Sequence, residues 1–216
     1  MPDKCFDLAV VDPPYFSGPE RRGYYGSKES KIGVHRDYPI SPTWELPKTE
    51  YFAELQRVSK HYIVWGCNYF VFPFAPGRIV WDKCNSSSTF SDCEIAATNS
   101  HDSVRLFRFM WNGMCQGKSI NEGYIKQGDK TLNEKRIHPT QKPVALYAWL
   151  YSRYAKRGDK ILDTHLGSGS SRIAAYNAGL DFVGFEIDRN YFEAQEARFA
   201  RHTAQGNLFL EGVYGT

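Results

Sequence analysis

A strand, a glycine-rich turn, a helix and a second strand follow one another in the C-terminal part of the chain. The first strand is expected at Lys160–Asp163 and the second at Phe182–Ile187, with the glycine turn 166–170 and a helix ending near Gly179 between them. This order is typical of a parallel, doubly wound sheet. The 216 residues suffice for one well-buried core and not for a second full domain. We therefore expect a single α/β domain with a Rossmann-like, mostly parallel sheet.

The rest of the chain adds strands and helices to this unit. Phe6–Val11 is apolar at every position but Asp7, as expected for a strand covered on both faces. Cys93–Thr98 and Ser103–Trp111 are predicted to pair with each other, and Gln205–Leu210 is a candidate for a further strand. The remaining predicted elements are strands at His61–Trp65 and Arg78–Asp82, and helices at Lys48–Ser59, 143–155 and Asn190–His202.

The glycine turn is a candidate cofactor site. Gly167 and Gly169 lack side chains, so a ligand can approach the backbone closely, and the next helix begins with free N–H groups. Glu186, at the end of the following strand, can accept hydrogen bonds from two ribose hydroxyls. A tight turn required only for packing is the alternative. The third glycine of the phosphate fingerprint is replaced by Arg172, and the P-loop lysine is absent. A cofactor without phosphates, S-adenosylmethionine, therefore fits better than NAD or ATP.

A second motif, Asp12-Pro13-Pro14-Tyr15, follows the apolar strand Phe6–Val11. Two prolines in sequence make a stiff loop, and loops at the carboxyl ends of strands in open α/β sheets are common ligand sites. By itself this motif indicates only that something binds at a strand end.

Taken together, the motifs resemble those of the amino-methyltransferases of DNA. The segments that carry the resemblance are Asp12–Tyr15, Ile137-His138-Pro139-Thr140-Gln141-Lys142-Pro143, Ile161-Leu162-Asp163 with Gly167-Ser168-Gly169, and Gly184-Phe185-Glu186-Ile187-Asp188. Because the catalytic loop precedes the cofactor glycines, the order is similar to that of the permuted β class. The resemblance implies a methyltransferase domain with a catalytic half 1–111, a short target-recognition segment 112–136 and a cofactor-binding half 137–204.

The resemblance also assigns roles to matching residues. Asp12, Pro13, Pro14 and Tyr15 would be catalytic, and the cofactor-binding set would be Lys142, Asp163, Gly167, Ser168, Gly169 and Glu186. Within this set, Asp163 and the glycines would line the methionine part of S-adenosylmethionine. Glu186 would hold the ribose, and Lys142 would reach the carboxylate. The chain departs from the family at Thr164-His165, where Asp-Pro-Phe is common, and at Ser171, which replaces a threonine.

The chemistry of the Asp-Pro-Pro-Tyr loop follows from its acceptors. The exocyclic nitrogen of adenine is a poor nucleophile because its lone pair is delocalised. The Asp12 carboxylate and the Pro13 carbonyl can accept its two N–H groups and free that lone pair. Tyr15 supplies a ring on which an extruded base can stack, although a core aromatic is its plainer interpretation. With aspartate rather than serine in the first position, the loop resembles the adenine-N6 subset of the family more than the cytosine-N4 subset, which remains the alternative. A non-catalytic DNA- or cofactor-binding module is the third alternative.

Double-stranded DNA is the partner that the resemblance implies. The net charge of +3 is small, but residues 17–36 and 117–136 are both basic. Arg21, Arg22 and Lys28 are candidates for phosphate contacts, with Arg105 and Arg108 near the recognition segment. So short a segment predicts a short target or weak specificity, unless a second copy in a homodimer or another subunit adds contacts.

Other features limit the setting in which the protein works. The chain begins without the basic and apolar pattern of a signal peptide, and its apolar runs are too short to span a membrane. The five cysteines are widely spaced, which favours reduced thiols over zinc or disulfides. We therefore expect a cytoplasmic, nucleoid-associated protein of a bacterium or phage, with no metal.

Overall fold

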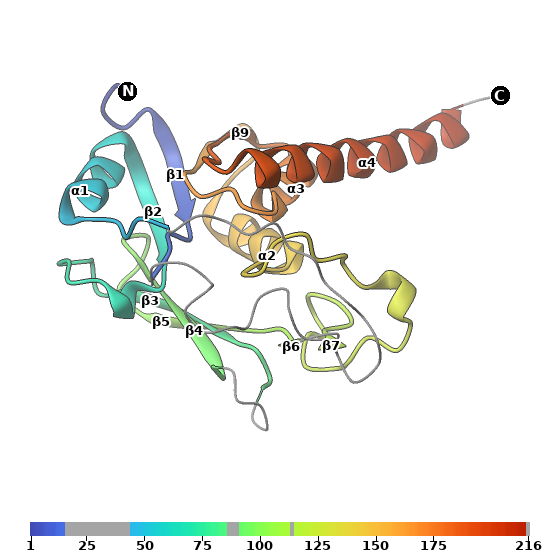
Figure 1. The fold of residues 1–216 in the computed structure, drawn as a ribbon, viewed down its shortest axis with the longest axis horizontal. Coiled ribbons are helices and arrows are strands. Elements are labelled where there is room, and N and C mark those ends of the chain that lie inside the picture. Colours follow the sequence, from blue (N-terminus) through green and yellow to red (C-terminus); the bar gives the residue numbers. More distant parts are fainter. Residues whose placement is uncertain (16–43, 86–90, 113–114, 215–216) are drawn as a thin grey trace.

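The computed structural model describes residues 1–15, 44–85, 91–112 and 115–214, with side chains described up to residue 204. In these residues seven strands form one sheet in the order β5-β3-β4-β2-β1-β8-β9 (Figure 1). The strands are β1 (Phe6–Val11), β2 (Ser59–Trp65), β3 (Gly77–Asp82), β4 (Cys93–Thr98), β5 (Val104–Arg108), β8 (Lys160–Asp163) and β9 (Asp181–Gly184). A separate ribbon pairs β6 (Trp111–Asn112) with β7 (Cys115–Gln116).

The strand pairings confirm the mostly parallel, Rossmann-like α/β fold. β1 runs parallel to both of its neighbours, β2 and β8, and β8 runs parallel to β9. Among the described strands of this seven-stranded sheet, only β4 is antiparallel to both of its neighbours, β2 and β3. The chain thus leaves the central strand β1 toward β2 on one side and later returns to β8 on the other, which creates a topological switch point between β1 and β8.

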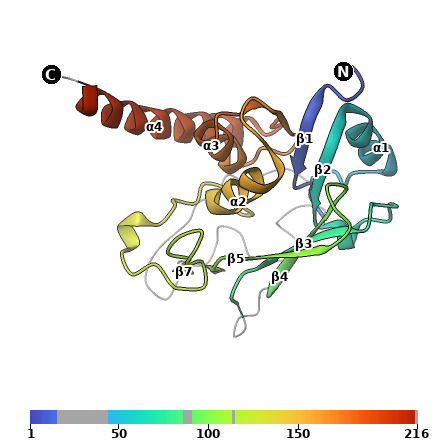
Figure 2. The same ribbon diagram turned by 180° about the vertical axis from the view of Figure 1, so that it is seen from behind.

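Helices cover both faces of the sheet (Figure 2). They are α1 (Thr49–Val58), α2 (Val144–Tyr154), α3 (Ser170–Asn177) and α4 (Arg189–Tyr214), with short 3-10 helices η2 (Cys67–Tyr69) and η3 (Lys130–Leu132). Leu8 and Val10 of β1 belong to the core cluster of α2 and α3, whereas Ala9 and Val11 belong to the cluster of α1. Because its two faces meet different helices, β1 has to be apolar at every one of these positions.

The expected pairing of Cys93–Thr98 with Ser103–Trp111 is wrong, although both strands exist. β3 lies between them, antiparallel to β4 and parallel to β5. The connection from β4 to β5 therefore passes over the start of β3, at Gly77. A Cβ atom on Gly77 would lie 1.9 Å from the His101 carbonyl oxygen and 2.7 Å from that of Thr98. The absence of a side chain at this one position allows the crossing.

The C-terminal prediction is also wrong in part. The last helix was expected to end at His202, with a strand at Gln205–Leu210, but α4 continues without a break to Tyr214. It extends past α3 and away from the sheet (Figure 1). Residues 205–210 therefore belong to a helix and pair with no strand. No helix among the described residues is long and apolar enough to cross a membrane.

The crossing at Gly77 predicts a large effect of a single methyl group. Gly77→Ala should lower the free energy of unfolding by about 2–3 kcal/mol, because two backbone carbonyls would have to move. Gly128→Ala is the matched control, since a Cβ there meets nothing within 4 Å. Urea unfolding followed by circular dichroism measures both. Equal stability of the two variants would show that the β4–β5 connection leaves room for a Cβ atom at position 77.

Candidate active site

The two predicted halves of the site lie at the same edge of the sheet. Asp12 directly follows β1, and Asp163 is the last residue of β8. The strands are paired in parallel, with Leu8 opposite Ile161 and Ala9 opposite Leu162. Their carboxyl ends, and the loops that follow them, are therefore neighbours. This is the edge at which ligands bind in open α/β sheets.

Asp12 takes part in a cluster of charged side chains. The Lys142 ammonium donates to Asp12 Oδ2 and also lies 2.9 Å from Glu94 Oε2. The other oxygen of Glu94 pairs with Lys83 Nζ at 2.5 Å. Tyr15 donates its hydroxyl to Asp12 Oδ1 at 2.9 Å. Two carboxylates and two ammonium groups thus form a chain that joins the loop after β1, β4, the residue after β3 and the segment before α2.

Burial makes these charges interdependent. The exposed fraction is 4% for the Lys142 side chain, 15% for Asp12 and 20% for Glu94. Burial raises the pKa of Asp12, and the charge of Glu94 adds to this, whereas Lys142 opposes it. Burial also works against the charge of Glu94, but Lys142 and Lys83 together lower its pKa to about 2. Burial disfavours the Lys142 ammonium as well, yet the two carboxylates outweigh it and raise its pKa. Glu94 and Lys142 are therefore charged at neutral pH.

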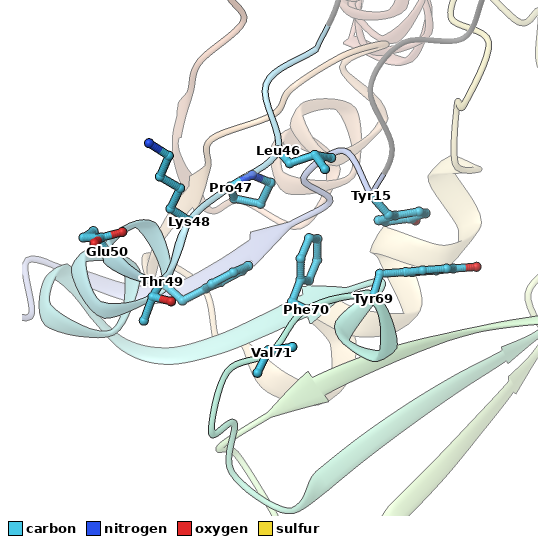
Figure 3. A pocket seen from close by; sticks show the side chains of 10 residues that line it. Tyr15, Leu46, Pro47, Lys48, Thr49, Glu50, Tyr69, Phe70 and Val71 are labelled. Atoms are coloured by element: carbon cyan, nitrogen blue, oxygen red, sulfur yellow. The ribbon is translucent and has the colours of Figure 1, made fainter. Parts of the chain in front are cut away.

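Tyr15 is neither in the core nor free in solvent. Its ring stacks on Tyr69 with centroids 4.8 Å apart and an interplanar angle of 8°, and Phe70 meets it edge-on (Figure 3). Gly66 makes this possible, since its Cβ would lie 2.2 Å from a Tyr15 ring carbon. An open pocket of about 460 Å³ adjoins these rings and is bounded on its other side by the start of α1.

The glycine turn between β8 and α3 has the geometry expected of a ligand cradle. Gly167 and Gly169 have φ values of 53° and 72°, which favour glycine over residues with a side chain. Glu186 accepts the N–H groups of Gly167 at 2.7 Å and of Asp188 at 2.9 Å. The Ile187 N–H also hydrogen-bonds this carboxylate, so at least one of its roughly four acceptor sites remains for a ligand hydroxyl. The nearest atom to a Cβ on Gly167 is 3.7 Å away, in the His138 ring.

Two further predicted residues have structural partners in this turn. Asp163 accepts hydrogen bonds from Ser171 Oγ at 2.5 Å and from the His165 N–H at 3.0 Å. Burial raises the pKa of Asp163 to about 7, although both hydrogen bonds oppose this. Ser168 is buried, and its hydroxyl lies 3.0 Å from that of Ser170. Direct contact of Asp163 and Ser168 with a cofactor therefore stays a prediction.

Thr164 and His165, which depart from the family pattern, form a polar contact with α1. The Thr164 hydroxyl lies 2.6 Å from that of Tyr51 and 3.0 Å from His165 Nδ1. The rings of Tyr51 and His165 meet edge-on, with centroids 5.5 Å apart. Burial lowers the pKa of His165 to about 4, so this histidine is neutral at pH 7.

Several residues of the site were not found from the sequence. Glu94 and Lys83 complete the charged cluster, Tyr69 stacks on Tyr15, and Arg198 of α4 donates to the Ser168 carbonyl at 2.8 Å. Arg198 also pairs with Glu134 at 3.0 Å, which links α4 to the segment 112–136. No local motif marks these side chains, because each becomes relevant only through contacts across strands or helices.

The proposed DNA contacts are only partly described. Arg21, Arg22 and Lys28 lie outside the described residues. Arg105 and Arg108 are exposed on the edge strand β5, where Arg108 pairs with Asp82 at 3.0 Å. In its described residues, the segment 112–136 contains β7, the 3-10 helix η3 and a bridge between Gly117 and Lys126.

Comparison with known proteins relates the chain to DNA methylases. Residues 110–197 match the N6_N4_Mtase family model, described as DNA methylase. Over 92% of its length, the chain is 19% identical to the type II methyltransferase M.HinfI of Haemophilus influenzae. It is 21% identical to M.HpaI of Haemophilus parainfluenzae, also over 92% of its length. It covers 64% of the first relative and 69% of the second. The matching family model is thus one of DNA methylases, and both relatives are type II methyltransferases.

Solved structures agree on the fold. The M1.HpyAVI–SAM complex aligns with a TM-score of 0.50 at 19% identity, over 90% of this chain and 89% of that one. The cytosine-N4-specific PvuII DNA methyltransferase aligns with a TM-score of 0.52 at 12% identity, over 92% of this chain and 81% of that one. The chain therefore has the Rossmann-like fold of these methyltransferases.

The raised pKa of Asp163 predicts how stability depends on pH. The folded protein holds this proton up to about pH 7, whereas the unfolded chain releases it near pH 3.8, so stability should fall as pH rises between these values. Between pH 4.5 and 7.5, the wild type should lose roughly 3 kcal/mol more than Asp163→Asn, at about 1.4 kcal/mol for each pKa unit. Urea unfolding at the two pH values measures this. Equal losses would mean that Asp163 is already ionised in the folded protein at pH 4.5.

Proposed function

We propose that the protein transfers a methyl group from S-adenosylmethionine to the exocyclic N6 of an adenine in double-stranded DNA. One observation carries the proposal: the Asp12–Tyr15 loop and the glycine turn of Gly167 and Gly169 lie at the carboxyl ends of the paired strands β1 and β8. An acceptor for an amino group is thus next to a cradle for a nucleoside. The match to the DNA methylase family model and the names of the relatives support methyl transfer to DNA, without a choice between adenine and cytosine.

The cofactor assignment rests on the fit of the glycine turn. We infer that Gly167, Ser168, Gly169 and Asp163 line the methionine part of S-adenosylmethionine and that the free acceptors of Glu186 hold its ribose. The guanidinium of Arg172 is paired with Glu196 and Gln195 and so is not free to bind a phosphate. This supports a cofactor without phosphates at the turn. The solved M1.HpyAVI structure with SAM, which shares this fold, supports the choice of cofactor.

The loop after β1 would activate the amino group. Asp12 accepts one N–H and the Pro13 carbonyl accepts the other, so that the nitrogen becomes more tetrahedral and its lone pair becomes available. The residue before a proline is held extended, so the Pro13 carbonyl has a fixed direction. Bound S-adenosylmethionine would supply the methyl group, with the electron pair of its broken S–C bond left on sulfur as the new N–C bond forms. The amine loses its proton after transfer. In-line transfer of this kind depends on alignment more than on a strong base.

The target base must leave the duplex to reach Asp12. The aromatic surface of Tyr15, Tyr69 and Phe70 beside the open pocket supports stacking of the extruded base there. Tyr15 also donates to Asp12, so its ring and the acceptor are held in one unit. We infer that Tyr15 contacts the base directly and that Tyr69 supports it from behind.

Contacts with the DNA backbone would come from the basic loops. We propose Arg21, Arg22 and Lys28 for phosphates, and Arg105, Arg108 and the segment 117–136 for the target sequence. This recognition surface is small, which favours a short target. Methylation by the chain alone confined to a target longer than about six base pairs would contradict this. A second copy or another subunit would then have to add contacts.

Cytosine-N4 methylation is the second candidate, because one protein with this fold is cytosine-N4-specific. Aspartate as the first residue of the Asp12–Tyr15 loop favours adenine. A non-catalytic module is the third candidate, because Thr164 and His165 depart from the family pattern beside the cofactor turn. The intact loop at Asp12–Tyr15 argues against a module, since binding alone would not need it.

Incubation with labelled cofactor and unmethylated DNA, followed by mass spectrometry of the nucleosides, tests the proposal. We expect N6-methyladenine from the wild type and a loss of about 10²–10³-fold in kcat for Asp12→Ala, the magnitude known for removal of one group that stabilises a transition state. Asp102→Ala is the matched control, since Asp102 is exposed in the β4–β5 connection. It should retain full activity.

The same assay separates the alternatives. N4-methylcytosine as the product would overturn the choice of base and leave the reaction class intact. Cofactor binding measured by calorimetry, without label in DNA, would instead favour the module.

A further inference from the structure

Glu94 is a charged residue in the interior with no place in the reaction described above. It projects from β4, two strands away from the Asp12 loop on β1, and contacts no residue of the glycine turn in the described structure. Its two oxygens are divided between two ammonium groups: Oε1 pairs with Lys83 at 2.5 Å and Oε2 with Lys142 at 2.9 Å.

Lys142 is the closer of two links between Glu94 and the catalytic loop, since the Tyr15 hydroxyl also donates to Glu94 Oε2, at 3.4 Å. Its ammonium contacts Asp12 and Glu94 at once, and its side chain is 4% exposed. An ammonium held by Asp12 alone would neutralise that carboxylate and occupy one of its oxygens, while Tyr15 occupies the other. A carboxylate in that state is a weak acceptor for the amino group of a base. A second carboxylate on the same ammonium reduces this effect, because the positive charge is then divided between two partners.

We propose that Glu94 is a positioning residue that shares the Lys142 ammonium with Asp12 and so keeps Asp12 a strong acceptor for the target amine. Lys83 sets the strength of this effect, because it takes up part of the charge of Glu94. The inference rests on the proposed function for its catalytic consequence. The effect of Glu94 on the pKa of Asp12 involves only residues of this chain and can be measured without methyl transfer.

Two substitutions should act in opposite directions. Glu94→Gln keeps the size of the side chain and removes its charge, so Lys142 is left to Asp12 alone. Asp12 then releases its proton at lower pH, by about one unit. Lys83→Met leaves more of the negative charge of Glu94 beside Lys142 and Asp12, so Asp12 should titrate at higher pH than in the wild type. Glu54→Gln, in an exposed pair with Arg57 on α1, is the matched control and should change nothing.

The titration of Asp12 can be followed by NMR in the full chain, labelled with ¹³C at aspartate carboxyl groups and assigned with Asp12→Asn. The other titratable groups that interact with Asp12 are Tyr15, Tyr51 of α1, Tyr147 of α2 and Asp163 of β8. All of them are unchanged in the three variants. An unchanged Asp12 midpoint in Glu94→Gln would overturn the proposal. A raised midpoint would also overturn it. Lys142 would then have moved away from Asp12 once Glu94 lost its charge, so the role of Glu94 would be to keep Lys142 next to Asp12.

Kinetics supply the second readout. In Glu94→Gln, kcat should fall about tenfold, which matches one pKa unit of acceptor strength. The dissociation constant for S-adenosylmethionine, measured by calorimetry, should stay within about twofold, since the glycine turn is untouched. Full kcat would overturn the proposal, as would a loss of cofactor affinity equal to the loss of activity. A wild type that methylates no DNA would refute the proposed function, whereas the Asp12 midpoints in the two variants would still decide the role of Glu94.

Discussion

The contact of Lys142 with Asp12 and Glu94 is the interaction on which the candidate site depends. Two carboxylates in a largely enclosed place repel each other and lose their hydration, so they require a cation with good geometry. Lys142 supplies it from the segment before α2. The same contact ties together β1, β4 and that segment, which are far apart in the chain. Removing the ammonium would leave Asp12 without a cation in the interior, whereas Glu94 would keep its pair with Lys83.

The sheet makes this contact possible through the position of β1. Helices cover both faces of this strand, so its residues from Leu8 to Val11 are apolar, and the polar chemistry of the site begins at its carboxyl end, with Asp12. The parallel neighbour β8 ends at the same edge with Asp163 and the glycine turn. The acceptor for the target amine and the cradle for the cofactor therefore come from strands that are adjacent in space and about 150 positions apart in sequence.

Much of the fold could be predicted because its signals are local. The apolar run Phe6–Val11 and the strand–glycine–helix order after Lys160 both depend on near neighbours in the chain, and the structure confirms both elements. Two predictions about which strands exist and pair were wrong. Cys93–Thr98 was paired with Ser103–Trp111, but β3 lies between them, and Gln205–Leu210 is part of α4. A short loop usually joins paired strands, and only Gly77 lets this one pass over a third strand.

The sequence by itself determined the fold class, the two motifs and their order, because hydrophobic period, prolines and glycines act on the residues next to them. The partners of each charged group were decided only by the tertiary structure. Lys142 was expected at a cofactor carboxylate, a role that stays a prediction, and the structure adds its contacts with Asp12 and Glu94. Glu94 has no sequence signal at all. Its contacts with Lys142 and Lys83 arise from the strand order, since electrostatic coupling depends on distance in space and not on separation along the chain.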